Sequence, residues 1–237
     1  MSLTRIGRLV SAGVTAVAGL TVVASSAGAS PSLTAQQLFR AAATNAKAAT
    51  WVHETATVVS GSQAAWESRD IGVDRGRELV ITSTHAMIRV LYYTKSPVVF
   101  IVGNGLGVQG LFTTSAHQTK DSGHWFYGSP LTSYGSLANG LTISSAFGTA
   151  FASSAGLTLL GPSVDHGVAV IGVRQVVPAT ATSPKITSVY YFTATGPTLP
   201  VSASEFYGGL LLTAHWSKWN VPATWATPRG ALPVAKA

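Results

Sequence analysis

The chain of 237 residues contains no cysteine. This absence excludes disulfides, thiolate nucleophiles and cysteine-ligated metals, and it excludes a lipid anchor attached to an N-terminal cysteine. Charged residues are also scarce, at 10% against a usual share of about 25%. Hydrophobic residues make up 46% of the chain. This composition excludes a disordered, highly charged protein and is sufficient for a sizeable core.

Acidic residues are fewer than basic ones, eight against fifteen, so the formal net charge is +7. The basic residues are scattered along the chain rather than clustered, which argues against nucleic-acid binding. A mildly basic surface fits peripheral contact with anionic lipid or a wall polymer. With so few carboxylates a paired-carboxylate site is not expected, although two that are distant in sequence could meet.

The N-terminus has the layout of a cleavable export signal. Arg5 and Arg8 precede an uncharged, mostly apolar run over residues 9–23, and Ala27-Gly28-Ala29 has the small-x-small pattern of a signal peptidase site. Gly, Ser and Thr dilute the run, so it would make a weak membrane span. We therefore expect a signal peptide over residues 1–29, one domain over 30–228 and a flexible tail over 229–237, in a secreted or cell-envelope protein. Loss of Arg5 and Arg8 lowers the net charge from +7 to +5.

The remaining chain begins with a helix and then turns to strands. Thr34 and Gln37 form a capping-box pattern before apolar residues at helical spacing, which predicts an amphipathic helix over 34–49. Short β-branched and aromatic runs with turn residues between them predict antiparallel strands. The predicted strands are 52–59, 65–73, 79–83, 86–93, 98–102, 168–177, 186–195, 199–205 and 210–216.

The middle of the chain is uncharged: residues 122–164 contain no Asp, Glu, Lys or Arg. Ile143, Phe147 and Phe151 are spaced by four residues, which indicates helices with apolar surroundings on more than one side. Two interpretations remain open. The helices are buried in the core, or they close over an apolar cavity.

None of the short motifs indicates catalysis. Gly105, Gly107 and Gly110 imitate a dinucleotide fingerprint, but the acid expected about twenty residues on is missing, so we expect a loop. His53-Glu54 lacks the second histidine of a zinc-protease helix. A serine hydrolase uses the residue types found at Ser163, Asp165 and His166, but the nucleophile elbow is missing from this segment. We therefore expect a turn there. No cofactor, metal site or enzymatic activity is predicted.

The six tryptophans could stack on sugars or bases, although packing on a sheet is the commoner role. Several segments of the chain resemble a known family. The strongest are residues 186–201, with Gly196-Pro197 and Leu199-Pro200-Val201, and residues 212–222, with Trp216, Trp219 and Asn220. Residues 123–127 and 164–172 add weaker similarity. Together these segments resemble the mycobacterial LppX/LprG group of envelope lipoproteins, although the lipobox cysteine of that group is absent.

The resemblance implies an α+β fold in which a strongly curved antiparallel sheet, a LolA-like half-barrel, wraps around helices and leaves a hydrophobic cavity. It also implies carriage of acyl lipids or glycolipids. We expect a monomer, and the missing lipobox cysteine argues against tethering of this chain to a membrane. The uncharged segment and inward strand residues would line the cavity, although alternation alone leaves open which strand face points inward. The predicted lining residues are Leu137, Leu141, Ile143, Phe147, Phe151, Val168, Val170, Val189, Tyr191, Val201, Leu210 and Leu212.

Two further hypotheses stay open beside a lipid carrier. One is a non-catalytic envelope interaction or stress-sensing module, which has a partner protein and the same half-barrel with its cavity filled by side chains. The other is an enzyme, which would require reactive groups within hydrogen-bonding reach of each other in a cleft. Fold alone does not decide between them.

Overall fold

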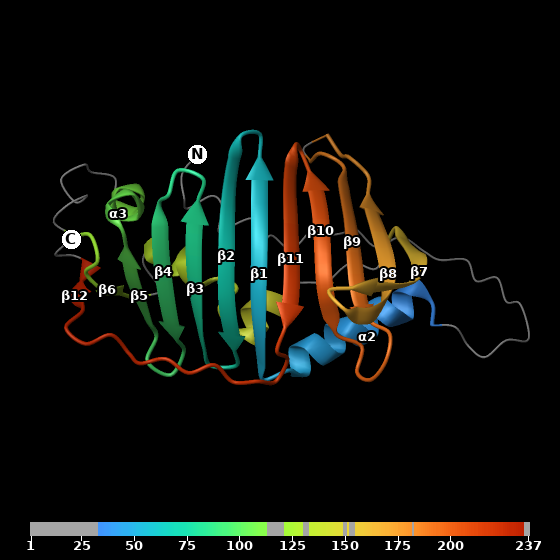
Figure 1. The fold of residues 1–237 in the computed structure, drawn as a ribbon, viewed down its shortest axis with the longest axis horizontal. Coiled ribbons are helices and arrows are strands. Elements are labelled where there is room, and N and C mark those ends of the chain that lie inside the picture. Colours follow the sequence, from blue (N-terminus) through green and yellow to red (C-terminus); the bar gives the residue numbers. More distant parts are fainter. Residues whose placement is uncertain are drawn as a thin grey trace, which may run out of the picture.

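A computed structural model of the chain describes residues 33–112, 121–129, 133–148, 151, 155–181 and 183–234. The predicted signal peptide therefore lies outside the described residues. Strands dominate the described part (Figure 1). They are β1 (Trp51–Ser60), β2 (Gln63–Gly72), β3 (Arg75–Thr82), β4 (Met87–Tyr93), β5 (Val98–Gly103), β6 (Phe126–Gly128), β7 (Leu157–Asp165), β8 (Val168–Val177), β9 (Ile186–Thr193), β10 (Pro200–Tyr207), β11 (Leu210–Ser217) and β12 (Leu232–Pro233).

All twelve strands form one open sheet in the order β12-β6-β5-β4-β3-β2-β1-β11-β10-β9-β8-β7. Every pairing is antiparallel except that of β12 with β6. Two meanders, β1 to β5 and β7 to β11, are joined where β1 pairs with β11, with His53 opposite Ser217. The sheet is thus a continuous surface whose central seam joins segments far apart in sequence.

The described helices are α2 (Ala35–Ala48), α3 (Gly105–Phe112), the 3-10 helix η1 (Ser133–Ala138) and α5 (Ile143–Phe147). Thr34 caps α2 as predicted: its side chain accepts a hydrogen bond from the Gln37 amide, and the Gln37 side chain accepts one from the Thr34 amide. Thr142 begins α5 with the same kind of reciprocal cap, using Ser145. Within the described residues, no helix is both long and apolar enough to cross a membrane.

Helices α2, η1 and α5 pack on one face of the sheet, and η1 and α5 lie behind the strands in Figure 1. Because successive strand residues point to opposite sides, the register assigns each side chain to a face. We call the helix face the one that carries Val52, Ile71, Val90, Val173 and Phe192. The opposite, outer face carries the alternate residues. The predicted α+β class with a large antiparallel sheet is confirmed; wrapping of the sheet around the helices stays a prediction.

Two segments differ from the sequence-based expectation. Residues 157–165, in the uncharged stretch predicted to be helical, form the edge strand β7. The glycine segment from Gly105 forms helix α3 rather than a loop. Gly107 is needed there because a Cβ atom would lie 2.1 Å from the Met87 carbonyl oxygen, so α3 can approach β4 only at glycine. Helical spacing in a Gly/Ser-rich stretch did not distinguish a half-exposed strand from a helix.

The C-terminal segment after β11 runs along one end of the strands to the far edge of the sheet (Figure 1). Trp225 packs edge-on against Trp51 and lies between the guanidinium groups of Arg75 and Arg77. Residues 229–234 belong to the predicted flexible tail, and Leu232 and Pro233 among them pair with β6.

The capping box gives a direct test of how the first helix is held. Thr34→Ala removes the hydroxyl that accepts from the Gln37 amide at 3.2 Å, so the free energy of unfolding should fall by about 1 kcal/mol. Thr44→Ala, in the exposed middle of α2, is the matched control and should leave stability unchanged or slightly raised. Urea unfolding measures both. Equal losses in the two variants would contradict a specific role for the cap.

Candidate functional site

The helix face carries apolar clusters under the helices. Beneath α2, Phe39 meets Tyr190 and Phe192 of β9 and Phe151, with ring centroids 5.0–6.0 Å apart. Val173 of β8 is fully buried in the same cluster. These rings prefer edge-to-face packing, which adds roughly 0.5–1.5 kcal/mol per pair beyond area burial. This end of the helix face is therefore filled by the protein's own side chains.

The second cluster lies at the other end of the sheet. Leu141 and Ala138, after and within η1, are buried against Ile88 and Val90 of β4 and against residues of β5. The backbone of this loop lies directly against β3: a Cβ atom at Gly76 would lie 1.9 Å from the Leu141 carbonyl oxygen. Between the two clusters, α5 packs Ile143 and Phe147 on the central strands.

A further apolar cluster on the helix face is built from strands alone within the described residues. Its members are Val58, Ala65, Val80, Leu210 and Leu212, from β1, β2, β3 and β11. Cross-strand pairing places them together, since Val58 lies opposite both Ala65 and Leu212. No described helix contributes a side chain to it, in contrast to the clusters under the helices.

Next to this cluster lies a buried ion network centred on Arg69. Its guanidinium donates to Glu78 at 2.5 Å, to Glu54 at 3.2 Å and to Glu67. All four side chains are at most 6% exposed. Trp216 Nε1 donates to the other oxygen of Glu54 at 3.0 Å. Glu67 Oε1, in contrast, has no hydrogen-bond partner in the described part of the chain.

Burial and charge act against each other in this network. Burial is the main cause that raises the pKa of Glu67 from 4.5 to about 7, with Glu78 and Glu54 adding to it and Arg69 opposing. Burial alone would lower the pKa of Arg69, but the three carboxylates outweigh it and raise that pKa. The carboxyl of Glu67 is therefore partly protonated near neutral pH. The helix face is consequently amphiphilic rather than wholly apolar.

The predicted lining residues fall on both sides of the sheet. Leu137, Leu141, Ile143, Phe147 and Phe151 lie in the helical segments, all packed toward the helix face. Val201, Leu210 and Leu212 share that face by alternation along β10 and β11. The other four, Val168, Val170, Val189 and Tyr191, alternate with Ile171, Val173, Tyr190 and Phe192 and so point to the outer face. Lining of a cavity by the first eight stays a prediction.

Tyr191 instead lines a pocket of about 340 Å³ on the outer face. Strand side chains Thr55, Thr57, Ser202, Ser204, Thr213 and His215 line it together with His166 from the β7–β8 turn. The rings of His166 and His215 lie 4.1 Å apart, and Ser202 Oγ donates to Asp165 Oδ2 at 2.5 Å. These contacts fasten the tip of the β7–β8 hairpin across β10 and β11.

The Asp165–His166 pair forms a turn, as predicted, but its side chains do not diverge: His166 Nδ1 lies 3.0 Å from Asp165 Oδ1. The serine nearby is Ser202, not Ser163, and its hydroxyl hydrogen-bonds to the carboxylate rather than to an imidazole. A hydrolytic triad needs the serine against the base. His53-Glu54 lies in β1, as expected, with the two side chains on opposite faces. In the described part of the chain, no group of three or more His, Asp or Glu side chains could hold a metal ion.

The Arg69 network was missed from the sequence, although a signal was present. Glu67 and Arg69 share the strand parity of the buried residues Ala65 and Ile71. A charged side chain on the buried face of a strand is costly unless it is paired. Two of them in one strand therefore indicate partners on neighbouring strands. Carboxylates from three neighbouring strands meet here around the guanidinium of Arg69.

Similarity to known proteins is found in the fold and not in the sequence. No family model and no curated protein matches the chain. Among solved structures, LprF from Mycobacterium bovis superposes with a TM-score of 0.55 over 83% of this chain and 97% of LprF, at 14% identity. LppX from Mycobacterium tuberculosis gives 0.45 over 80% and 97%, at 16% identity, and MucB in complex with MucA gives 0.43 over 81% and 57%, at 14% identity. The fold is that of LprF, and at the level of fold the resemblance to the LppX/LprG group is confirmed.

The Arg69 network predicts a pH dependence of stability. Since the pKa of Glu67 is raised to about 7 on folding, the folded chain binds more protons than the unfolded chain between pH 4.5 and 7. Its favourable contribution is present below pH 4.5 and is lost as the pH rises toward 7. Glu67→Gln should remove this slope and be more stable than wild type at pH 8, by up to about 3 kcal/mol.

Urea unfolding at pH 5 and pH 8 measures the difference between the two proteins, which isolates Glu67 from histidines that titrate in the same range. Asp74→Asn, at a half-exposed carboxylate, is the control and should keep the wild-type slope. Arg69→Met should cost about 3–5 kcal/mol at pH 8, because three buried carboxylates lose their shared cation. A Glu67→Gln variant with the full wild-type slope would contradict the assignment.

Proposed function

We propose that this chain is a non-catalytic carrier or binding protein for an amphiphilic ligand, an acyl lipid or glycolipid, held on the helix face of a half-barrel. The observation that supports it most is the cluster of Val58, Ala65, Val80, Leu210 and Leu212, to which no described helix contributes. Val58, Ala65 and Leu210 are at most 9% exposed, so this central part of the sheet is an apolar surface, shielded from water, against which an acyl chain would pack. The likeness in fold to LprF agrees with this proposal.

Carrying an acyl lipid through water requires only that its apolar surface is buried. Each methylene buried is worth about 0.8 kcal/mol, so a sixteen-carbon chain costs roughly 12 kcal/mol to leave in water. A carrier therefore offers apolar lining and no reactive group. Glu67, whose Oε1 has no hydrogen-bond partner in the described part of the chain, lies two residues after Ala65 in β2 and therefore on the same face. A hydroxyl of an amphiphile placed there would satisfy this oxygen, which favours a ligand with a polar group over a plain hydrocarbon.

The proposal includes export. The N-terminal signal pattern places the mature protein in the cell envelope or outside the cell, cleaved near Ala29. Without a cysteine for lipidation, it moves between lipid surfaces through water rather than staying tethered to one. A net charge of +5 favours contact with anionic surfaces at each end of that path.

A second candidate is an interaction or sensing module whose helix face is filled. The packing of Phe147 against Trp216 and Trp219, and of Phe151 against Phe39, favours it, because these rings occupy space that a guest would need. A protein partner recovered by pull-down from envelope extracts, together with lipid-free purified protein, would support this alternative.

The test is organic extraction of the purified mature protein with mass spectrometry, followed by uptake of a fluorescent fatty acid. Acyl lipid in the extract is expected. Leu212→Gln should weaken uptake about tenfold or more, since it replaces an apolar contact on the helix face. Leu211→Gln, one residue away and 41% exposed on the outer face, is the matched control and should bind as wild type. A clean extract with no uptake would defeat the carrier proposal.

A further inference from the structure

The outer-face pocket is built independently of the helix face. Ala56, Ala203 and Ala214 reach it only through their backbone, because their side chains belong to the helix face by alternation. The side chains that line it come from four adjacent strands, β9, β10, β11 and β1, and from the β7–β8 turn. Its volume of about 340 Å³ lies in the range of about 300–1,000 Å³ that small-molecule sites occupy.

Strand register arranges the lining in two parallel rows. In one row, Ser204 lies opposite Thr213, Thr213 opposite Thr57, and Thr57 opposite Trp66 of β2. In the other row, Tyr191 lies opposite Ser202, Ser202 opposite His215, and His215 opposite Thr55. Neighbouring strands are about 4.8 Å apart, so each row offers polar groups at that interval across the sheet.

Most of these hydroxyls are uncommitted. Within the described part of the chain, the side chains of Thr55, Thr57, Ser204 and Thr213 form no hydrogen bond with protein groups, whereas Ser202 is held by Asp165. Each hydroxyl can donate and accept, and each threonine also presents a methyl group. The surface thus alternates small apolar patches with two-way hydrogen-bonding groups.

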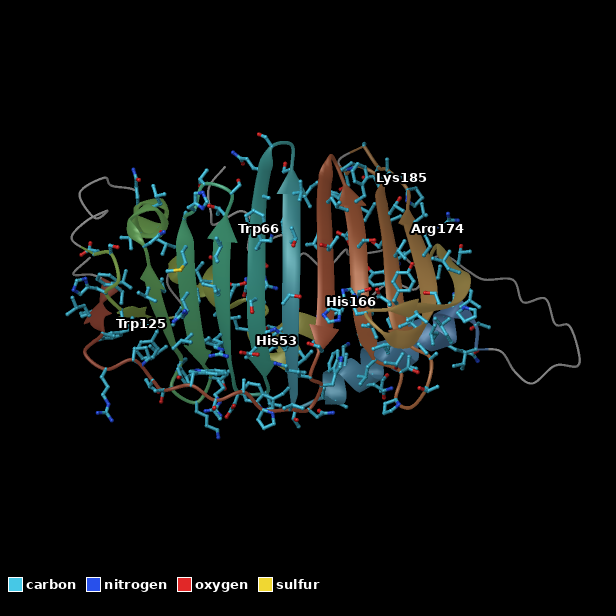
Figure 2. All side chains as sticks on the ribbon, viewed as in Figure 1. His53, Trp66, Trp125, His166, Arg174 and Lys185 are labelled. Atoms are coloured by element: carbon cyan, nitrogen blue, oxygen red, sulfur yellow. The ribbon has the colours of Figure 1, made fainter. Side chains whose placement is uncertain are left out.

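Aromatic rings flank the rows at both ends. Tyr191 closes the β9 side of the pocket, and the indole of Trp66 is 48% exposed beyond Thr57. Figure 2 shows Trp66 and His166 on either side of the seam between β1 and β11. An indole presents an apolar ring face beside a polar N–H, which suits a partner that is partly apolar and partly polar.

The pocket offers no permanently charged side chain to an ionic ligand. Among the described residues that line it there is no Lys, Arg, Asp or Glu. Burial, with the neighbouring His166 and His53, lowers the pKa of His215, so its imidazole is neutral at pH 7. The carboxylate of Asp165 is engaged by Ser202 and His166. A neutral ligand rich in hydroxyls is the chemistry that matches.

We propose that the outer face, from Tyr191 to Trp66, binds a neutral saccharide chain, with sugar hydroxyls on the Ser/Thr rows and one sugar ring stacked on Trp66. A pyranose has the same alternation of C–H patches and hydroxyls as the lining. The site is separate from the helix face and does not depend on the lipid proposal. The saccharide belongs either to a free glycan or to the headgroup of a glycolipid, and the experiment distinguishes them.

The test titrates the full mature protein with maltotriose, mannotriose, cellotriose and triacetylchitotriose, followed by ligand-observed NMR. At least one should bind with a Kd in the millimolar range or tighter. Thr57→Val and Thr213→Val keep side-chain shape but remove a hydroxyl, so each should weaken binding about fivefold. Trp66→Leu should weaken it by a similar factor or more. Thr187→Val, on the same face but opposite Phe206 and outside the pocket, is the control and should bind as wild type.

A second arm uses phosphatidylcholine vesicles with and without digalactosyldiacylglycerol. Binding of a trisaccharide with no gain on glycolipid vesicles identifies a free glycan. A gain on glycolipid vesicles that Thr57→Val reduces identifies the headgroup. No binding in either arm, or binding unchanged in all three pocket variants, would overturn the proposal. Leu212→Gln should leave saccharide binding intact, so failure of the carrier proposal and failure of this one are told apart.

Discussion

The guanidinium of Arg69 holds the centre of this sheet together. It bonds to carboxylates on β1, β2 and β3, and through Glu54 it reaches the Trp216 indole of β11. A buried cation surrounded by three acids tolerates only the strand register that brings all of them within reach. A slip of one residue would turn Glu67 and Arg69 to the outer face and leave their partners buried and unpaired. The network therefore contributes specificity of pairing, whatever its net contribution to stability.

The two faces of one sheet have different chemistry because of the period-two alternation. Along β11, Leu210, Leu212 and Ala214 point to the helix face, while Leu211, Thr213 and His215 point outward. Two adjacent residues can thus belong to surfaces with unrelated partners. Substitutions at neighbouring positions of this strand separate effects on one face from effects on the other without changing the local backbone.

Much of the fold could be predicted from local pattern. The capping residues Thr34 and Gln37 fixed the start of α2, and β-branched runs with turn residues placed nine of the strands within a few residues. Residues 157–165 could not be assigned, because leucine with Gly, Ser and Thr fits a helix or an edge strand equally. For the candidate site, helix-face residues such as Leu141 were found by hydrophobicity, whereas the facing of Val170 and Tyr191 depends on pairing partners that alternation within one strand does not identify.

The pairing of β1 with β11 limits the order in which the sheet can fold. His53 and Ser217 are paired across this seam, so the chain must be made through residue 217 before this ladder can form. A chain that stops short of β11 retains two separate meanders, each with an unpaired inner edge able to add a foreign strand. Loop closure over such a separation is entropically costly, and the rest of the sheet gives no shorter route to it. Completion of the sheet thus waits for its last long strand, and the two meanders stay unpaired with each other until β11 is made.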